Sequence, residues 1–234
     1  MADLHTPLLL IDTSTQVCSV AIASSAGVIS QRVSYEGNSH AANVGLFVSE
    51  VLTDAKQEGI LPTAVAISSG PGSYTGLRIG SSIAKGICFG MGIPLIAVPT
   101  LEVIAEAARS IAREDWLLCP MIDARRMEVY TAFFDSAGRA LTDTVSAIID
   151  ADSFVEELKQ HQILFVGNGT EKCRPFIKGA NAHFVDEVIH PLAEYMFKPA
   201  FLRMQTLQYE DVAYWEPFYL KEFVATVAKN KVIH

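Results

Sequence analysis

Hydrophobic and polar positions change their spacing along the chain in a regular order. An opening apolar run is followed by two alternating segments, which is typical of half-buried strands. A longer stretch then repeats its apolar positions at helical spacing. After it, short apolar runs alternate with further helical stretches. The first half is thus predicted to contain strands at 8–12, 17–24 and 28–35, a helix at 39–57, a strand at 63–68, a helix at 73–90, a strand at 94–98 and a helix at 100–112.

The same order of features occurs a second time. A constant offset of 111 residues places Ile11-Asp12 on Ile122-Asp123 and Ser25-Ala26-Gly27 on Ser136-Ala137-Gly138. The second copy lacks long, strongly patterned helices; it is predicted to hold a strand at 127–135, a helix from 152 and a strand at 163–166. Such a repeat indicates two α/β lobes of related topology. We assign 1–113 to the first lobe and 114–234 to a smaller second lobe.

Composition and charge narrow the class of protein. Half of the 234 residues are apolar and 19% are charged, as in ordinary globular proteins. The 18 basic and 26 acidic residues give a net charge of −8 without any basic run. Binding to a phosphate backbone relies on clustered positive charge, so any nucleic acid is expected to be held mainly by another molecule.

Two further features bear on the compartment. Residues 1–7 carry no lysine or arginine, and the longest uncharged run, 86–101, is short and interrupted by Pro94. We therefore expect no secretory leader, no membrane association and a cytoplasmic location. The cysteines form no CxxC pair and the histidines no HxxxH or HExxH pair. Free buried thiols are predicted, in preference to disulfides or zinc, for Cys18, Cys88, Cys119 and Cys173.

Polar residues follow the first predicted strand. Backbone N–H groups and hydroxyls around Asp12, Ser14 and Thr15 can hold a phosphate, and Asp12 can hold Mg²⁺ through water. The alternative is that these side chains only satisfy their own turn. The equivalent segment of the second copy, 123–126, is interpreted as a solvated hairpin, with a binding site as its alternative.

A glycine-rich segment, 70–76, opens the helix at 73–90. A helix start can receive an anion. The segment is neither a P-loop nor a nucleophile elbow, because the required Lys and the Gly-x-Ser-x-Gly order are missing. It also lacks a well-placed acid for the ribose of a dinucleotide.

Small residues recur along this helix at a spacing of four: Gly72, Gly76, Gly80 and Ala84. A glycine inside a helix costs about 1 kcal/mol relative to alanine. A ridge of small residues lets another backbone approach closely. That neighbour can be the chain's own sheet, its helix at 39–57, or a helix of another subunit.

Several stretches together resemble one known family. They are 9–14, 70–80, 84–86, 99–102 and 123–126, with an echo at 216–221. These stretches are similar to the TsaB (YeaZ) family, accessory subunits of the machinery that forms N6-threonylcarbamoyladenosine (t6A) in tRNA. The similarity is close over 8–135 and looser beyond. It implies the α/β, two-lobed fold of actin, sugar kinases and Hsp70 (ASKHA), with a reduced second lobe.

The resemblance implies a non-catalytic scaffold that binds and stabilises the catalytic subunit TsaD and recruits the ATPase TsaE. It also implies self-pairing through the same surface, and contact with tRNA only through the complex. ATP and metal belong to the partner. The sister enzyme carries His-Leu-Glu-Gly-His where this chain has Thr100-Leu101-Glu102-Val103-Ile104. Threonine is a weak ligand and isoleucine none, so we expect no metal site and no catalysis in this chain.

The family is thought to pair through the helices that correspond to 39–56 and 73–90. The implied interface residues are Ser39, His40, Asn43, Phe47, Gly72, Gly76, Arg78, Ile79, Gly80 and Ser82. No cofactor is required of this chain, although weak ATP or ADP binding at Asp12, Ser14 and Thr15 is an open expectation. The rival functions are an independent ATP-binding kinase or ATPase of the same fold and a glycoprotease-like peptidase. No metal or triad spacing supports the peptidase.

Overall fold

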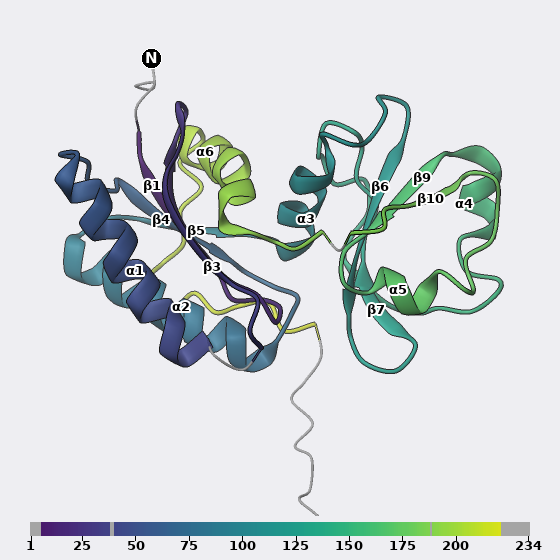
Figure 1. The fold of residues 1–234 in the computed structure, drawn as a ribbon, viewed down its shortest axis with the longest axis horizontal. Helices are drawn as coiled ribbons and strands as arrows, with labels where there is room; N and C mark the ends of the chain where they lie inside the picture. The colour runs from purple at the N-terminus through teal and green to yellow at the C-terminus, as the bar shows by residue number, and fades with distance from the viewer. Residues whose placement is uncertain (1–5, 38–39, 188, 221–234) are drawn as a thin grey trace, which may run out of the picture.

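The computed structural model describes residues 6–37, 40–187 and 189–220, excluding the side chains of 40 and 41. Two five-stranded sheets form the centres of two lobes (Figure 1). The first sheet contains β1 (Leu8–Asp12), β2 (Cys18–Ser24), β3 (Gly27–Ser34), β4 (Ala64–Ser68) and β5 (Leu95–Val98). The second contains β6 (Leu117–Asp123), β7 (Glu128–Thr131), β8 (Val145–Ile148), β9 (Ile163–Val166) and β10 (Ala182–Phe184). The helices are α1 (His40–Gln57), α2 (Tyr74–Met91), α3 (Thr100–Ala108), α4 (Val155–Gln160), α5 (Thr170–Cys173), the 3-10 helix η1 (Ala193–Met196) and α6 (Phe197–Gln205).

The two sheets share one strand order. It is β3-β2-β1-β4-β5 in the first lobe and β8-β7-β6-β9-β10 in the second. β1 pairs antiparallel with β2 and parallel with β4, and β6 pairs in the same two ways with β7 and β9. The duplication predicted from the sequence offset is therefore present in the topology.

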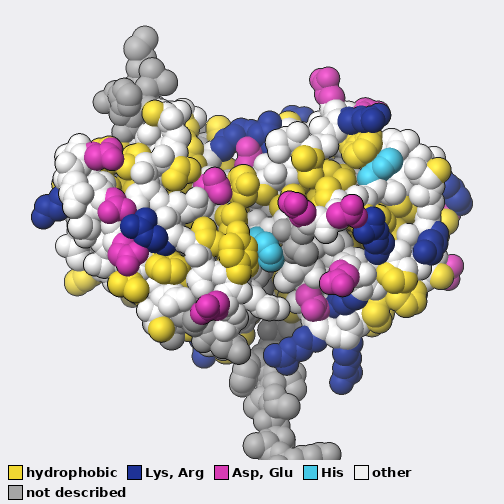
Figure 2. All heavy atoms as spheres, viewed as in Figure 1, with side chains coloured by type: hydrophobic (Ala, Val, Ile, Leu, Met, Phe, Trp, Pro, Cys, Tyr) yellow, Lys and Arg dark blue, Asp and Glu magenta, His cyan; other side chains and the backbone are white. Residues whose placement is uncertain are grey.

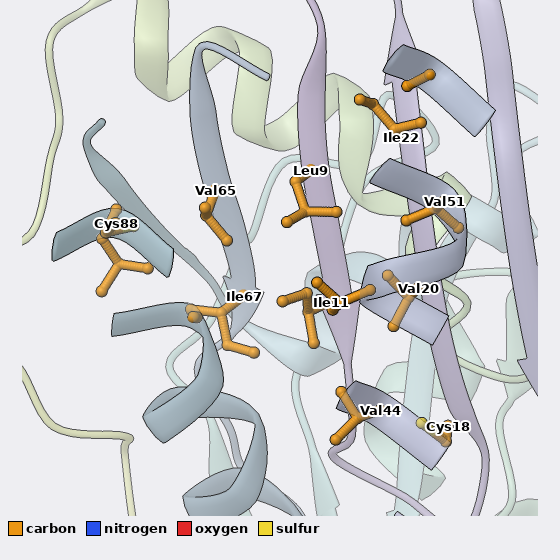
Figure 3. Close-up of a cluster of buried hydrophobic side chains, with 14 residues drawn as sticks. Leu9, Ile11, Cys18, Val20, Ile22, Val44, Val51, Val65, Ile67 and Cys88 are labelled. Atoms are coloured by element: carbon orange, nitrogen blue, oxygen red, sulfur yellow. The ribbon is translucent and has the colours of Figure 1, made fainter. Parts of the chain in front are cut away.

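Helices cover both faces of the first sheet. On one face, α1 and α2 lie side by side and pack on Leu9, Ile11 and Ile67 (Figures 1 and 3). On the other face, η1 and α6 pack on Leu8 and Leu10. All five residues of β1 are buried as a result, which explains why the strand is an unbroken apolar run up to its final acid.

The chain returns to the first lobe after it has built the second. Residues 193–205 pack on the first sheet through η1 and α6. The Glu210 N–H then donates to the Leu95 carbonyl, and the Phe218 N–H donates to the Ser69 carbonyl. The sequence boundary of 114–234 had assigned this segment to the second lobe. Chain order alone does not show a return of this kind.

The second lobe has shorter helices between its strands than the first, as predicted. Its crossover helices α4 and α5 have six and four residues, whereas α1 and α2 have 18 each. One face of its sheet is covered by α3, through Leu101 and Ile104.

Two further predictions from the sequence have outcomes here. The four cysteines are free and buried, as predicted. Among the described residues, none of the helices has the length and apolar character needed to cross a bilayer.

Candidate functional site

The turn after β1 buries a carboxylate. Asp12 is fully buried, and its Oδ1 accepts hydrogen bonds from the Ser14 N–H and the Ser14 Oγ, both at 3.0 Å. Burial raises the pKa of Asp12 to about 7, against the opposing effect of the two Ser14 donors. Close to neutral pH, both the protonated and the ionised form of Asp12 are therefore populated.

The glycine-rich segment closes over this turn. The Ser73 N–H donates to the Ser14 carbonyl at 2.6 Å, and the Thr13 Oγ1 donates to the Gly76 carbonyl at 2.7 Å. A Cβ at Gly72 would lie 2.2 Å from the Ser14 carbonyl oxygen, and one at Gly76 would lie 2.0 Å from that of Thr13. These glycines are required because two backbones of the same chain meet there.

The glycine ridge therefore has an internal role. A Cβ at Gly80 would lie 2.2 Å from the Thr13 Oγ1, and Gly80 and Ala84 are buried. Of the neighbours left open by the sequence, the chain's own first lobe is the correct one. Interpreting Gly72, Gly76 and Gly80 as a contact with another subunit is wrong, because β1 and its turn already occupy the space beside them.

The same packing closes the expected nucleotide site. Asp12 and Ser14 have no exposed surface and Thr15 retains 6%. The Ser73 Oγ accepts a hydrogen bond from the Gly76 N–H, so the side chain of Ser73 caps the start of α2. In this conformation an ATP or ADP phosphate has no access to these three side chains.

The other predicted interface residues are divided between the interior and the surface. Phe47 and Ile79 are half-buried against the core shared by α1 and α2. Asn43 is also half-buried, whereas Arg78 and Ser82 are exposed. Ser39 lies outside the described residues, as does the side chain of His40.

The outward face of α1 and α2 contains residues that the sequence analysis did not select. Gly45 on α1, and Gly86 and Gly90 on α2, are exposed with open space where a Cβ would be. Leu46 is 54% exposed and Phe89 is 87% exposed. We call these five residues the outer helical face. The spacing of four that links Ser82, Gly86 and Gly90 is the sequence signal that could have identified its α2 side.

The equivalent turn of the second lobe is open. It is a hairpin, as predicted, and its Asp123 and both arginines are exposed. Arg125 and Arg126 have φ angles of 71° and 50°. The left-handed region costs a non-glycine residue on the order of 1–3 kcal/mol, so the surrounding contacts must hold this conformation in place.

A lysine and an asparagine provide those contacts. The Lys172 Nζ donates to the Asp123 carboxylate and, at 2.7 Å each, to the carbonyls of Arg126 and Glu128. The Asp123 N–H donates to the Asn168 Oδ1 at 3.0 Å, and the Arg125 N–H donates to the Asp123 Oδ1 at 2.8 Å. These contacts therefore hold the backbone of the turn in place, while Arg125 and Arg126 remain exposed to solvent.

Comparisons with known proteins agree with this architecture. A family model described as TsaD, tRNA N6-adenosine threonylcarbamoyltransferase, matches residues 20–231. The protein named tRNA threonylcarbamoyladenosine biosynthesis protein TsaB from Escherichia coli is 31% identical over 223 residues, 93% of this chain and 96% of that protein. Its namesake from Bacillus subtilis is 31% identical over 175 residues, 73% of this chain and 75% of that protein. The chain belongs to the TsaB (YeaZ) family.

A solved TsaB-family structure supports the fold. YeaZ from Pseudomonas aeruginosa superposes with a TM-score of 0.77 over 92% of this chain and all of that chain, at 24% identity. The two-lobed ASKHA fold with a reduced second lobe, expected from the TsaB resemblance, is confirmed.

The segment where the TsaB resemblance locates the sister enzyme's metal motif lies in the first turns of α3. Thr100 and Ile104 are fully buried, and the Thr100 hydroxyl has no hydrogen-bond partner among the described residues. Glu102 accepts hydrogen bonds from both terminal nitrogens of Arg203, at 2.9 and 2.7 Å. Across the described ranges, no group of His, Cys, Asp and Glu side chains is arranged to hold a metal ion.

A small hollow lies between α3, α6 and the hairpin at 137–140. Its volume is about 280 Å³, and Glu102, Glu106, Lys198 and Arg203 are among its lining residues. These four side chains are joined by ion pairs, Glu102 to Arg203 and Glu106 to Lys198. Arg139 also lines the hollow and pairs with Asp135. Every charged side chain of the lining is thus held in an ion pair, which disfavours use of the hollow as an anion site.

Proposed function

We propose that this chain is a non-catalytic scaffold subunit in t6A formation. It binds and stabilises a TsaD-like catalytic subunit and recruits a TsaE-like ATPase. The proposal is supported by the family, whose curated members from E. coli and B. subtilis are named for tRNA threonylcarbamoyladenosine biosynthesis. The observation that carries it in this molecule is the outer helical face.

This face has the properties of a helix-packing surface. Leu46 and Phe89 expose large apolar side chains, and desolvating apolar area is favourable by roughly 25 cal/mol per Å². Gly45, Gly86 and Gly90 each leave open space at the surface of their helix, so a partner helix can approach α1 and α2 closely at these positions. The occupant that we propose is a related molecule with a similar helix pair. A second copy of this chain can occupy the same face when the partner is absent.

The closed sites support the proposal that the partner performs the chemistry. The Asp12 turn is filled by the chain's own glycine-rich segment, and Thr100 and Ile104 are core residues. ATP and metal are accordingly bound by the catalytic subunit, and this chain requires no cofactor. The rival ATPase function would need Asp12 and Ser14 to become accessible.

Reconstitution tests the scaffold role. The TsaD-like and TsaE-like subunits are combined with the enzyme that supplies the threonylcarbamoyl donor, ATP, threonine, bicarbonate and tRNA, with and without this chain. We expect modified adenosine to fall at least tenfold when the chain is omitted. Undiminished modification would show that the chain is not a required subunit.

A surface variant tests the outer helical face. Gly86→Leu adds bulk where nothing lies within 4 Å, so the monomer should fold. We expect it to weaken co-elution with the TsaD-like subunit at least tenfold, because the side chain fills the space a partner helix would use. Gln205→Leu, at an exposed position of α6, adds a similar side chain elsewhere on the lobe and should retain wild-type affinity. Equal affinity for both variants would exclude this face as the contact.

A further inference from the structure

We propose that the β6–β7 turn binds phosphate groups of an RNA backbone through Arg125 and Arg126. The proposal rests on the scaffold function, because it assigns this chain a supporting contact to the RNA that the complex modifies. It concerns a lobe that does not carry the outer helical face.

The first argument is that the two guanidinium groups have no counter-charge. Within the parts of the chain that the structure describes, neither Arg125 nor Arg126 forms an ion pair. Other exposed arginines of the same lobe do have one, since Arg139 pairs with Asp135 and Arg174 with Asp186. The two turn arginines are therefore available to an external anion.

The second argument is the conformation in which they are held. Both residues adopt a left-handed backbone, which glycine and asparagine adopt far more readily. An Asn-Gly pair would make this turn with less strain. Strain of this kind persists where the surroundings enforce it, and here Lys172, Asp123 and Asn168 do so. A turn backbone that is already fixed removes the cost of ordering the loop on binding and leaves only the cost of ordering the two side chains.

The chemistry favours phosphate. The planar guanidinium group matches the oxygens of a phosphate in a bidentate arrangement, and contacts to phosphates fix the position of a protein on a nucleic acid. A two-residue tip presents too little area for a stable protein interface, which usually buries more than about 1,000 Å². It is sufficient for one or two phosphate contacts.

The remaining surface sets the size of the effect. The chain carries a net charge of −8. The face drawn in Figure 2 mixes basic and acidic side chains without a continuous basic patch. Such a surface holds RNA only weakly by itself, and measurably only at low salt. The turn contributes one or two phosphate contacts to an RNA that the catalytic subunit holds.

The test measures RNA affinity of the complete complex. The variant Arg125→Asn/Arg126→Gly suits the left-handed backbone and removes both guanidinium groups. The variant Arg125→Lys/Arg126→Lys keeps both positive charges but loses the planar group that can bind a phosphate in a bidentate arrangement. The control Arg139→Gln/Arg174→Gln removes the same charge from paired arginines of the same lobe. Each complex is first checked for co-elution with the TsaD-like subunit, and its Kd for a substrate tRNA is then measured at several salt concentrations.

We expect the Asn/Gly variant to weaken tRNA binding about three- to tenfold and to make the salt dependence shallower by about one to two phosphate contacts. The double-lysine variant should fall between this variant and wild type, and the control should stay within about twofold of wild type. An unchanged Kd overturns the proposal, as does an equal loss in the control, which would indicate a bulk charge effect. Loss of co-elution with unchanged tRNA affinity would instead identify the turn as a protein contact and also overturn it.

The outcome is separable from that of the scaffold proposal. If the wild-type chain does not co-elute with the catalytic subunit, the scaffold role fails. The tRNA affinities of the full-length wild type and the variants are then compared at low salt without the partner. A loss confined to the Asn/Gly variant would still support a phosphate contact, and equal affinities would overturn it.

Discussion

Asp12 and Asp123 occupy equivalent places in the two lobes, at the ends of β1 and β6. Asp12 is fully buried and bonded within its own turn, whereas the side chain of Asp123 is 46% exposed and paired with Lys172. The same strand end has thus become part of the core in one lobe and part of an exposed turn in the other.

The segment after the next parallel strand explains the difference. In both lobes a glycine-containing loop approaches the end of the central strand closely; a Cβ at Gly167 would lie 2.4 Å from the Met121 carbonyl. In the first lobe α2 also lies close to the turn at Gly76 and Gly80, and the turn is therefore buried. In the second lobe α5 ends after four residues, and its Lys172 bonds the turn without covering it. The length and composition of one helix therefore decide whether the strand end is buried.

The largest expected effect concerns the buried carboxyl. The folded state raises the pKa of Asp12 from 3.8 to about 7, so it binds the proton more tightly than the unfolded chain does. This contribution to stability is complete below about pH 4 and is lost as the pH rises to about 7, by roughly 4 kcal/mol. Asp12→Asn has no such proton. Urea denaturation between pH 4 and 8 should show the wild type losing stability relative to the variant, and parallel profiles would contradict this account.

The second-largest effect tests the close approach of Gly76 to the Thr13 carbonyl. Gly76→Ala places a Cβ 2.0 Å from the Thr13 carbonyl oxygen, and the backbone must shift to accept it. We expect a loss of about 3 kcal/mol in the free energy of unfolding. Gly86→Ala is the matched control on the same helix, with open space around it, and should gain about 0.5–1 kcal/mol. Equal stability of the two variants would show that the close approach does not require glycine.

The open turn should depend on its lysine. Lys172→Met removes three hydrogen bonds from a side chain that is only 22% exposed, which should cost about 2 kcal/mol. Lys159→Met breaks an ion pair whose two side chains are 63% and 74% exposed, and should change stability by less than about 0.5 kcal/mol. Chemical denaturation of both variants gives the comparison. If Lys172→Met loses less stability than Lys159→Met, Lys172 does not stabilise the turn.

The smallest effect has the opposite sign. Arg125→Asn/Arg126→Gly relieves two left-handed arginines and should raise the free energy of unfolding by about 1 kcal/mol. The thermal midpoint should rise accordingly. A stabilised variant with weaker tRNA binding would show that the two arginines bind tRNA and lower the stability of the fold. A destabilised variant would show that the arginines support the fold.

The sequence alone determined the elements of the first lobe from β1 to α3, and the duplication of the fold. Helix α2, Tyr74–Met91, agrees within one residue with the predicted 73–90, and the Ser73 hydroxyl caps its first turn. The repeat with Asp12 and Asp123 appears as two sheets of one strand order. The hairpin at 123–126 was also predicted. These features depend on local spacing, which periodicity records directly.

Only the tertiary structure decided what lies beside each element. The spacing of Gly72, Gly76 and Gly80 required a close neighbour, yet it could not show whether that neighbour was Thr13 and Ser14 or another subunit. The return of 193–220 to the first sheet and the left-handed arginines were equally absent from the pattern. Periodicity defines the face of a helix, whereas the group that fills it is set by contacts between residues distant in sequence.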